Sequence, residues 1–210
     1  MSPKTYVVEH LDPELGPWSE LEYIAIARET AQKGGQFVLS GVPVELANNN
    51  LPARLTAEPA FRAETRGVEE LYSTPEARSR VCLLDPRAEK DIGPDDGAVF
   101  DVFLFGGILG DDPPRDRTGE LRAKGFEGRR LGPMQMTTDT AVRVTRMVIE
   151  ETFTLNTIPF LDNPDLKINE HESTEMPFRY VKRDDEMPVM PEGMMDLIKK
   201  DADKSIEDLF

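Results

Sequence analysis

Hydrophobic residues occur along the chain in short runs that alternate with longer amphipathic stretches. Apolar and β-branched runs predict strands over residues 5–10, 37–40, 80–84 and 99–104, and the segment 130–136 is predicted as a fifth short strand or an extended loop. Helices are expected over 20–33, 118–128 and 138–153. Strands that alternate with helices favour the α/β class. The run 99–104 is almost continuously apolar, which is typical of a parallel strand buried on both faces.

Local signals predict where two of these helices begin. Ser19, followed three residues later by Glu22, has the pattern of a capping box. Thr137 or Thr138 is the expected N-cap of the last helix. Asp139 falls in its first turn, where the helix dipole favours a negative charge.

Two stretches carry weaker patterns. Residues 42–79 mix charges, prolines and three consecutive asparagines, and are predicted as a connection with one or two small helices. Residues 156–210 are rich in Asp, Glu, Pro and Met, with extended pieces at 158–161 and 178–181 and a helix at 191–200. We therefore expect a domain of residues 1–155 and a C-terminal tail, residues 156–210, that folds back on it.

A glycine-rich turn ends the central strand. Gly106, Gly107 and Gly110 lack Cβ atoms, so a ligand can approach the main chain closely, at the strand end where α/β proteins bind ligands. The spacing matches neither the phosphate-binding loop nor the dinucleotide fingerprint. A glycine pair after a strand is also common in a simple turn. The charges and prolines of segment 111–117 favour the mouth of a site instead.

The chain of 210 residues carries a formal net charge of −15. Such acidity disfavours direct nucleic-acid binding, which depends on Lys and Arg neutralising phosphates, and favours a basic protein partner. Acidity that only keeps a protein soluble is the alternative. No signal peptide or membrane span is predicted. The single cysteine, Cys82, is expected in a buried strand and allows no internal disulfide, which fits a cytoplasmic location.

Six continuous motifs stand out in the sequence. They are Val81-Cys82-Leu83-Leu84-Asp85-Pro86-Arg87-Ala88, Phe105-Gly106-Gly107-Ile108-Leu109-Gly110-Asp111, Pro113-Pro114-Arg115-Asp116-Arg117-Thr118, Arg129-Arg130-Leu131-Gly132, Gln135-Met136-Thr137-Thr138-Asp139-Thr140-Ala141 and Thr174-Glu175-Met176-Pro177-Phe178-Arg179-Tyr180-Val181. In this order they resemble the fungal SPOUT-type protein arginine methyltransferases that modify a small-subunit ribosomal protein. The resemblance covers most of the chain and is weakest between about residues 42 and 79.

The resemblance implies an α/β SPOUT-type sheet with helices on both faces and a deep C-terminal trefoil knot. It places the knot and a site for S-adenosylmethionine within about residues 80–150. It also implies a monomer, because the tail covers the surface through which SPOUT proteins commonly dimerise. Mapped onto this chain, the cofactor-binding residues are Leu84, Asp85, Pro86, Phe105, Gly106, Gly107, Leu109, Gly110, Leu131, Gly132, Met136, Thr137, Thr138 and Thr140.

The implied activity is monomethylation of a single arginine in a basic small-subunit ribosomal protein. A guanidinium pKa of about 12.5–13.8 keeps arginine protonated and weakly nucleophilic. Carboxylates can orient the guanidinium and accept the leaving proton. We expect Glu9, Asp111 and Asp116 in this role, and Arg115 to position one of them or the cofactor carboxylate. A strand-end charge, a turn cap and an ion pair are the respective alternatives for the three carboxylates.

Two other functions stay open at the level of sequence. One is a SPOUT-type RNA methyltransferase, which the acidity disfavours. The other is a non-catalytic acidic adaptor that holds a basic ribosomal protein. A metal site is not expected, because the two histidines, His10 and His171, are isolated and have no paired ligand spacing.

Overall fold

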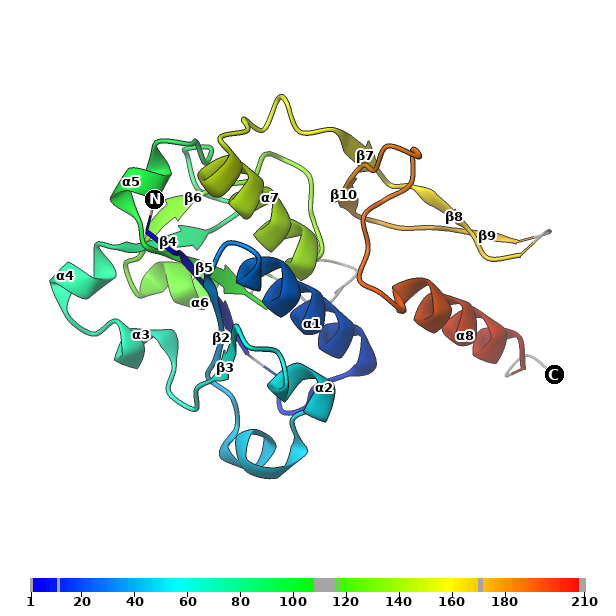
Figure 1. Cartoon of the computed structure of the whole chain (residues 1–210), viewed down its shortest axis with the longest axis horizontal. Helices are drawn as coiled ribbons and strands as arrows, with labels where there is room; N and C mark the ends of the chain where they lie inside the picture. Colours follow the sequence, from blue (N-terminus) through cyan, green and yellow to red (C-terminus); the bar gives the residue numbers. More distant parts are fainter. Residues whose placement is uncertain (1, 11, 108–115, 117, 170–171, 208–210) are drawn as a thin grey trace.

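A six-stranded parallel sheet forms the centre of the protein (Figure 1). The computed structural model describes residues 2–10, 12–107, 116, 118–169 and 172–207. The strand order is β3-β2-β1-β5-β4-β6, and every neighbouring pair is parallel. The strands are β1 Thr5–Glu9, β2 Gln36–Ser40, β3 Phe61–Ala63, β4 Val81–Leu84, β5 Val102–Gly106 and β6 Glu127–Arg129.

Side chains of the central strands alternate between two apolar layers. On β5, Phe103 and Phe105 face one layer, whereas Val102 and Leu104 face the other. The first layer also contains residues of α1 (Pro17–Ala31) and α7 (Thr138–Glu151). The second contains residues of α3 (Val68–Leu71) and α6 (Thr118–Ala123). The expected helices on both faces of the sheet are therefore present, and the central strand is buried on both sides.

Two predicted boundaries, the start of the central strand and the end of the helix after it, are wrong. Residues 96–99 form a helical turn, α5 (Asp96–Val99), in which Val99 is exposed, so the central strand begins at Val102. The predicted helix 118–128 ends at Ala123, because Gly125 takes a positive φ of 80° and the chain then turns into β6. Segment 130–136 is extended, with isolated bridges to Asp91 and Arg179 instead of a full strand, so the second of its two predicted forms, the extended loop, is confirmed.

The predicted start of α1 is also wrong. The helix begins at Pro17 with Gly16 as its N-cap, so Ser19 lies inside the first turn and is buried. Proline suits this position because its missing N–H has no partner at a helix start. The N-cap of α7 was predicted to be Thr137 or Thr138, and the structure shows that it is Thr137.

Residues 42–79 contain more structure than a connection with one or two helices. The π-helical turn η1 (Leu46–Asn50) and helix α2 (Ala53–Thr56) precede β3 at the sheet edge, and α3 and α4 (Pro75–Arg78) follow it. The edge strand and two of the short helices were missed, because each spans only three to five residues.

The C-terminal part packs beside α1 and α7 (Figure 1). Strand β7 (Phe160–Asp162) pairs antiparallel with β10 (Arg179–Val181), and β8 (Asp165–Lys167) pairs with β9 (Ser173–Glu175). A third apolar cluster joins Tyr180 and residues of α8 (Met194–Glu207) to Trp18 and Leu21 of α1. No helix among the described residues is long and apolar enough to cross a membrane. The division at residue 155 stays a prediction.

Candidate active site

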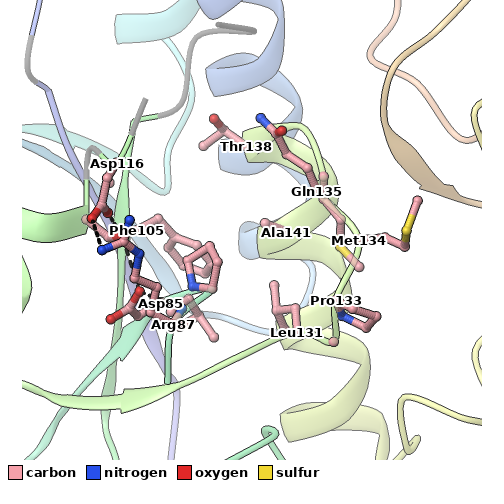
Figure 2. A pocket seen from close by; sticks show the side chains of 16 residues that line it. Asp85, Arg87, Phe105, Asp116, Leu131, Pro133, Met134, Gln135, Thr138 and Ala141 are labelled. Carbon is pink, nitrogen blue, oxygen red and sulfur yellow. Dashed lines mark hydrogen bonds and ion pairs between the residues drawn. The ribbon is translucent and has the colours of Figure 1, made fainter. Parts of the chain in front are cut away.

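A cavity of about 280 Å³ lies at the carboxyl ends of β4 and β5, next to the start of α7 (Figure 2). Its position follows from the fold, because parallel strands carry ligand sites at their carboxyl ends. The volume is close to the small end of the range for ligand pockets, about 300–1,000 Å³. The lining residues are Leu84, Asp85, Pro86, Arg87, Phe105, Gly106, Asp116, Thr118, Leu131, Gly132, Pro133, Met134, Gln135, Met136, Thr138 and Ala141.

One wall of the cavity is an extended segment whose main chain is largely unpaired. Among the described residues, the only backbone hydrogen bond of 131–135 is the one that the Gln135 carbonyl accepts from the Arg179 N–H, at 2.8 Å. Gly132 has a φ of +86°, which an L side chain rarely adopts. The wall therefore offers main-chain donors and acceptors to a ligand, beside the apolar side chains of Leu131 and Met136.

The opposite wall carries a network of charges (Figure 2). Arg122 donates to both carboxylate oxygens of Asp85, at 2.5 and 2.6 Å, and also to Asp116, at 3.3 Å. Thr118 donates to Asp85 at 3.2 Å, and Arg87 forms an ion pair with Asp116 at 3.1 Å. Fixed charges are thus held at the cavity by partners within the protein.

These contacts shift the acidity of both carboxyl groups. Burial alone would raise the pKa of Asp85, but the hydrogen bonds from Arg122 and the Arg87 N–H outweigh it and hold that pKa below its ordinary value. The hydrogen bonds from Arg122 likewise lower the pKa of Asp116, against a smaller opposing effect of burial. Both groups are therefore anionic at neutral pH. A carboxylate with such a low pKa is a weak base and therefore a poor proton acceptor.

Most of the residues expected to bind the cofactor lie around this cavity. Nine of them line it: Leu84, Asp85, Pro86, Phe105, Gly106, Leu131, Gly132, Met136 and Thr138. The lining also includes six residues outside that set: Arg87, Thr118, Pro133, Met134, Gln135 and Ala141. Sequence reasoning also missed Arg122, because a single arginine in a short basic helix carries no signal of its role.

Three other expected cofactor residues do not line the cavity. Thr137 donates to Asp139 at 2.7 Å and bonds Thr140 at 2.8 Å, so both threonines serve the first turn of α7. A Cβ on Gly107 would lie 3.2 Å from the Glu9 carbonyl oxygen, so glycine is needed there for close packing against β1. The remaining two, Leu109 and Gly110, lie outside the described residues.

The structure describes two of the four expected catalytic residues, Glu9 and Asp116. Asp111 and Arg115 lie outside the described residues. Asp116 lines the cavity but is paired with Arg87 and Arg122. Glu9 is buried at the end of β1 and does not line the cavity.

The carboxylate of Glu9 is engaged inside the protein. It accepts hydrogen bonds from the Ser40 hydroxyl and from the Val68 N–H, the latter at 3.1 Å. Cβ atoms on Gly41 and Gly67 would approach it to 3.2 and 3.1 Å. Glu9 thus joins β1 to the end of β2 and the start of α3, and its catalytic role stays a prediction.

Comparison with known proteins identifies close relatives. The sequence model of the family described as protein arginine N-methyltransferase SFM1-like matches residues 5–205. Protein arginine N-methyltransferase SFM1 of Saccharomyces cerevisiae is 44% identical over 213 residues, which cover 98% of this chain and 99% of that protein.

Solved structures extend the similarity to three dimensions. The crystal structure of yeast arginine methyltransferase SFM1 complexed with SAM (S-adenosylmethionine) has a TM-score of 0.85 at 43% identity, covering 96% of this chain and 92% of that one. The SAH complex has a TM-score of 0.83 at 42% identity, covering 92% and 94%. The expected α/β SPOUT fold is confirmed, and the knot stays a prediction. The chain belongs to the SFM1-like family of protein arginine N-methyltransferases.

Proposed function

We propose that this chain uses S-adenosylmethionine to add one methyl group to a single arginine of a basic small-subunit ribosomal protein. The observation that carries the proposal is the family match over residues 5–205 together with a cavity at the strand ends, where the family resemblance puts the cofactor. The enzyme class follows from the family. The ribosomal substrate and the single methyl group are inferences of ours.

The residues around the cavity fit this cofactor. Leu84, Phe105 and Ala141 supply apolar surface for an adenine ring, and the unpaired main chain of 131–135 supplies polar contacts at its edge. Thr118 and Thr138 add hydroxyl groups for the polar parts. When bound, the cofactor supplies an electrophilic methyl group on a sulfonium sulfur. Holding a nucleophile in line with such a group can lower the barrier by about 7–11 kcal/mol.

The charge of the protein supports a basic protein substrate. The chain has 40 acidic and 25 basic side chains. Ribosomal proteins that bind RNA are rich in Lys and Arg, so attraction between opposite charges would speed their association with this enzyme. The same negative charge repels RNA phosphates. We therefore favour the free ribosomal protein, rather than ribosomal RNA, as the molecule that is methylated.

Packing of the C-terminal part supports a monomer. Trp18 and Leu21 of α1 are covered by the cluster that includes Met194 and Ile198, and Val181 packs into the main core. These contacts occupy apolar surface that a partner subunit would otherwise need. Sedimentation of the intact chain is expected to give a monomer, and a dimer at micromolar concentration would contradict this part of the proposal.

A labelling experiment tests the proposed substrate. Purified enzyme and labelled S-adenosylmethionine are added to small ribosomal subunits and to their extracted proteins, each with and without ribonuclease. We expect label in one small basic protein that survives ribonuclease. Label that disappears with ribonuclease would show an RNA methyltransferase instead, and binding of the ribosomal protein without cofactor binding would show an adaptor.

A further inference from the structure

Glu22 of α1 is a buried carboxyl group that the cofactor cavity does not use. It is 1% exposed, and neither of its oxygens makes a well-aligned hydrogen bond with the described residues. Trp18, the Thr138 N–H and Asp139 lie close enough to interact with it. Burial first, and then the nearby Asp139 carboxylate, raise the pKa of Glu22 well above its ordinary value. No cation among the described residues pairs with it.

Asp139 and Tyr180 both interact with Glu22. Asp139 is 2% exposed and accepts from Arg143 at 3.2 Å and from Thr137 at 2.7 Å. The Tyr180 hydroxyl is buried without a partner in the described part of the chain. Burial and then the charges of Asp139 and Glu22 raise the pKa of Tyr180, whose hydroxyl lies within electrostatic reach of both carboxyl groups. Three side chains from α1, α7 and β10 therefore converge.

Arg143 does not neutralise this cluster alone. Besides Asp139 it binds Glu29, with N–O distances of 3.1 and 2.5 Å. Arg143 is thus the only cation that binds the cluster among the described residues, and it is shared with Glu29. A buried polar atom without a hydrogen-bond partner lowers the stability of the fold by about 1–3 kcal/mol. Such a cluster therefore suggests a function, such as the binding of a ligand that supplies the missing partners.

The cluster borders the cofactor cavity. Thr138 lines the cavity, and its N–H lies close to Glu22. Gln135 also lines the cavity, and its side-chain nitrogen is buried without a partner among the described residues. The N–H of Arg179, which precedes Tyr180, donates to the Gln135 carbonyl. Figure 2 shows Thr138 and Gln135 together at one end of the cavity, where the pale blue ribbon of α1 passes behind them.

We infer that Glu22, Asp139 and Tyr180 form the binding site for the guanidinium group of the substrate arginine. A guanidinium offers five N–H donors in one plane, which suits acceptors that converge from three elements. It also brings the positive charge that the two carboxyl groups lack. Trp18 lies beside Glu22 and is partly exposed, and an aromatic ring of this kind suits a cation. The inference rests on the proposed function, because that function supplies the arginine.

This assignment differs from the expected catalytic set. Among those carboxylates, Glu9 is engaged by Ser40 and Val68, and Asp116 by Arg87 and Arg122. Glu9 and Asp116 would each have to break an existing hydrogen bond or ion pair to bind the substrate guanidinium. Neither oxygen of Glu22 has such a partner among the described residues, and because its raised pKa favours the protonated form, guanidinium binding is expected to release a proton to the buffer.

Binding of a small probe tests the site without methyl transfer. Ethylguanidinium and ethylammonium are titrated by calorimetry into enzyme saturated with S-adenosylhomocysteine, in two buffers with different ionisation enthalpies. We expect ethylguanidinium to bind more tightly than ethylammonium, with proton release. Glu22→Gln and Tyr180→Phe are each expected to weaken it at least about tenfold, which corresponds to 1.4 kcal/mol. Two variants are used so that a folding defect in one leaves the test intact.

Glu150→Gln is the matched control. Glu150 is a carboxylate of α7 whose side chain is 10% exposed, but it accepts from the Tyr6 hydroxyl at 2.8 Å, at the far end of the helix. Its substitution should leave ethylguanidinium affinity unchanged, and all variants should bind S-adenosylhomocysteine like the parent. Equal binding of ethylguanidinium by Glu22→Gln, or no binding by the parent enzyme, would overturn the inference. Failure of the proposed function is seen separately, as absence of methyl transfer by the parent enzyme.

Discussion

Replacing Asp85 by Asn tests the charge network beside the cofactor cavity. The Asp85 side chain is 3% exposed and accepts four hydrogen bonds: two from Arg122, one from Thr118 and one from the Arg87 N–H. Asparagine keeps the shape and one acceptor, but its NH₂ group would face an Arg122 donor. Arg122 therefore loses at least one charged hydrogen bond.

The size of the effect follows from these contacts. A hydrogen bond to a charged group contributes about 1.5–3 kcal/mol. Arg122 is 34% exposed, so water compensates part of its loss, and we expect a decrease of about 1–3 kcal/mol in the free energy of unfolding. For a chain of this size, each kcal/mol lowers Tm by about 2–4 °C, so the expected decrease is about 2–12 °C.

The pH dependence of Tm shows whether the charge of Asp85 stabilises the folded protein. Because the pKa of Asp85 is lowered in the folded state, its stabilisation is complete above the unfolded value of about 3.9 and is lost as pH falls through the folded value. The difference in Tm between parent and Asp85→Asn should therefore be largest near neutral pH and shrink in acid. Thermal unfolding followed by circular dichroism measures both quantities.

A surface pair provides the control for this experiment. Asp91 and Arg130 also form a short ion pair, but their side chains are 52% and 41% exposed, so Asp91→Asn should lower the free energy of unfolding by less than about 1 kcal/mol. An Asp85→Asn protein as stable as the parent at neutral pH would refute the reasoning. So would a loss of stability that is the same at neutral and at acid pH.

Three further predictions concern the cavity and the core. Ala141→Trp places a large side chain of α7 in the cavity. It should weaken S-adenosylmethionine binding, measured by calorimetry, at least about tenfold and change Tm little. Unchanged affinity would exclude this cavity as the cofactor site. Burial raises the pKa of the Cys82 thiol to about 12, so it should not react with a thiol reagent near neutral pH until the protein unfolds, and rapid reaction of the folded protein would contradict the assigned burial. Leu104→Ala removes a fully buried side chain of β5 and should lower the unfolding free energy by about 2–5 kcal/mol in urea titration, and a loss below 1 kcal/mol would contradict the packing described.

The long apolar runs could be predicted from the sequence because burial on both faces leaves a continuous signal. Strands β1, β2 and β4 occur within a residue of their expected positions. Strands β3 and β6 have the sequences Phe-Arg-Ala and Glu-Gly-Arg, and each joins only one edge of the sheet. Three mixed residues that pair along one side have no periodicity to detect.

Glu22 shows why the site was harder to predict than the strands. Its spacing from Ser19 matches a capping box, and that local pattern predicted a place for Glu22 in the first turn of the helix. Because Pro17 begins α1 earlier, Glu22 lies inside the helix on the face that meets α7, next to Asp139. The loops around the cavity were predicted from the family resemblance. Contacts between elements that are distant in the sequence, such as the hydrogen bond from Arg122 to Asp85, could be found only from the three-dimensional structure.

Identification of the methylated residue tests the central claim most directly. The parent enzyme and Ala141→Trp are each incubated with purified small-subunit ribosomal proteins and S-adenosylmethionine, and the products are digested and analysed by mass spectrometry. We predict one monomethylated arginine in one basic protein with the parent enzyme, and at least tenfold less with the variant at subsaturating cofactor. Methylation of lysine or of RNA, or no transfer to any of these proteins, would contradict the account.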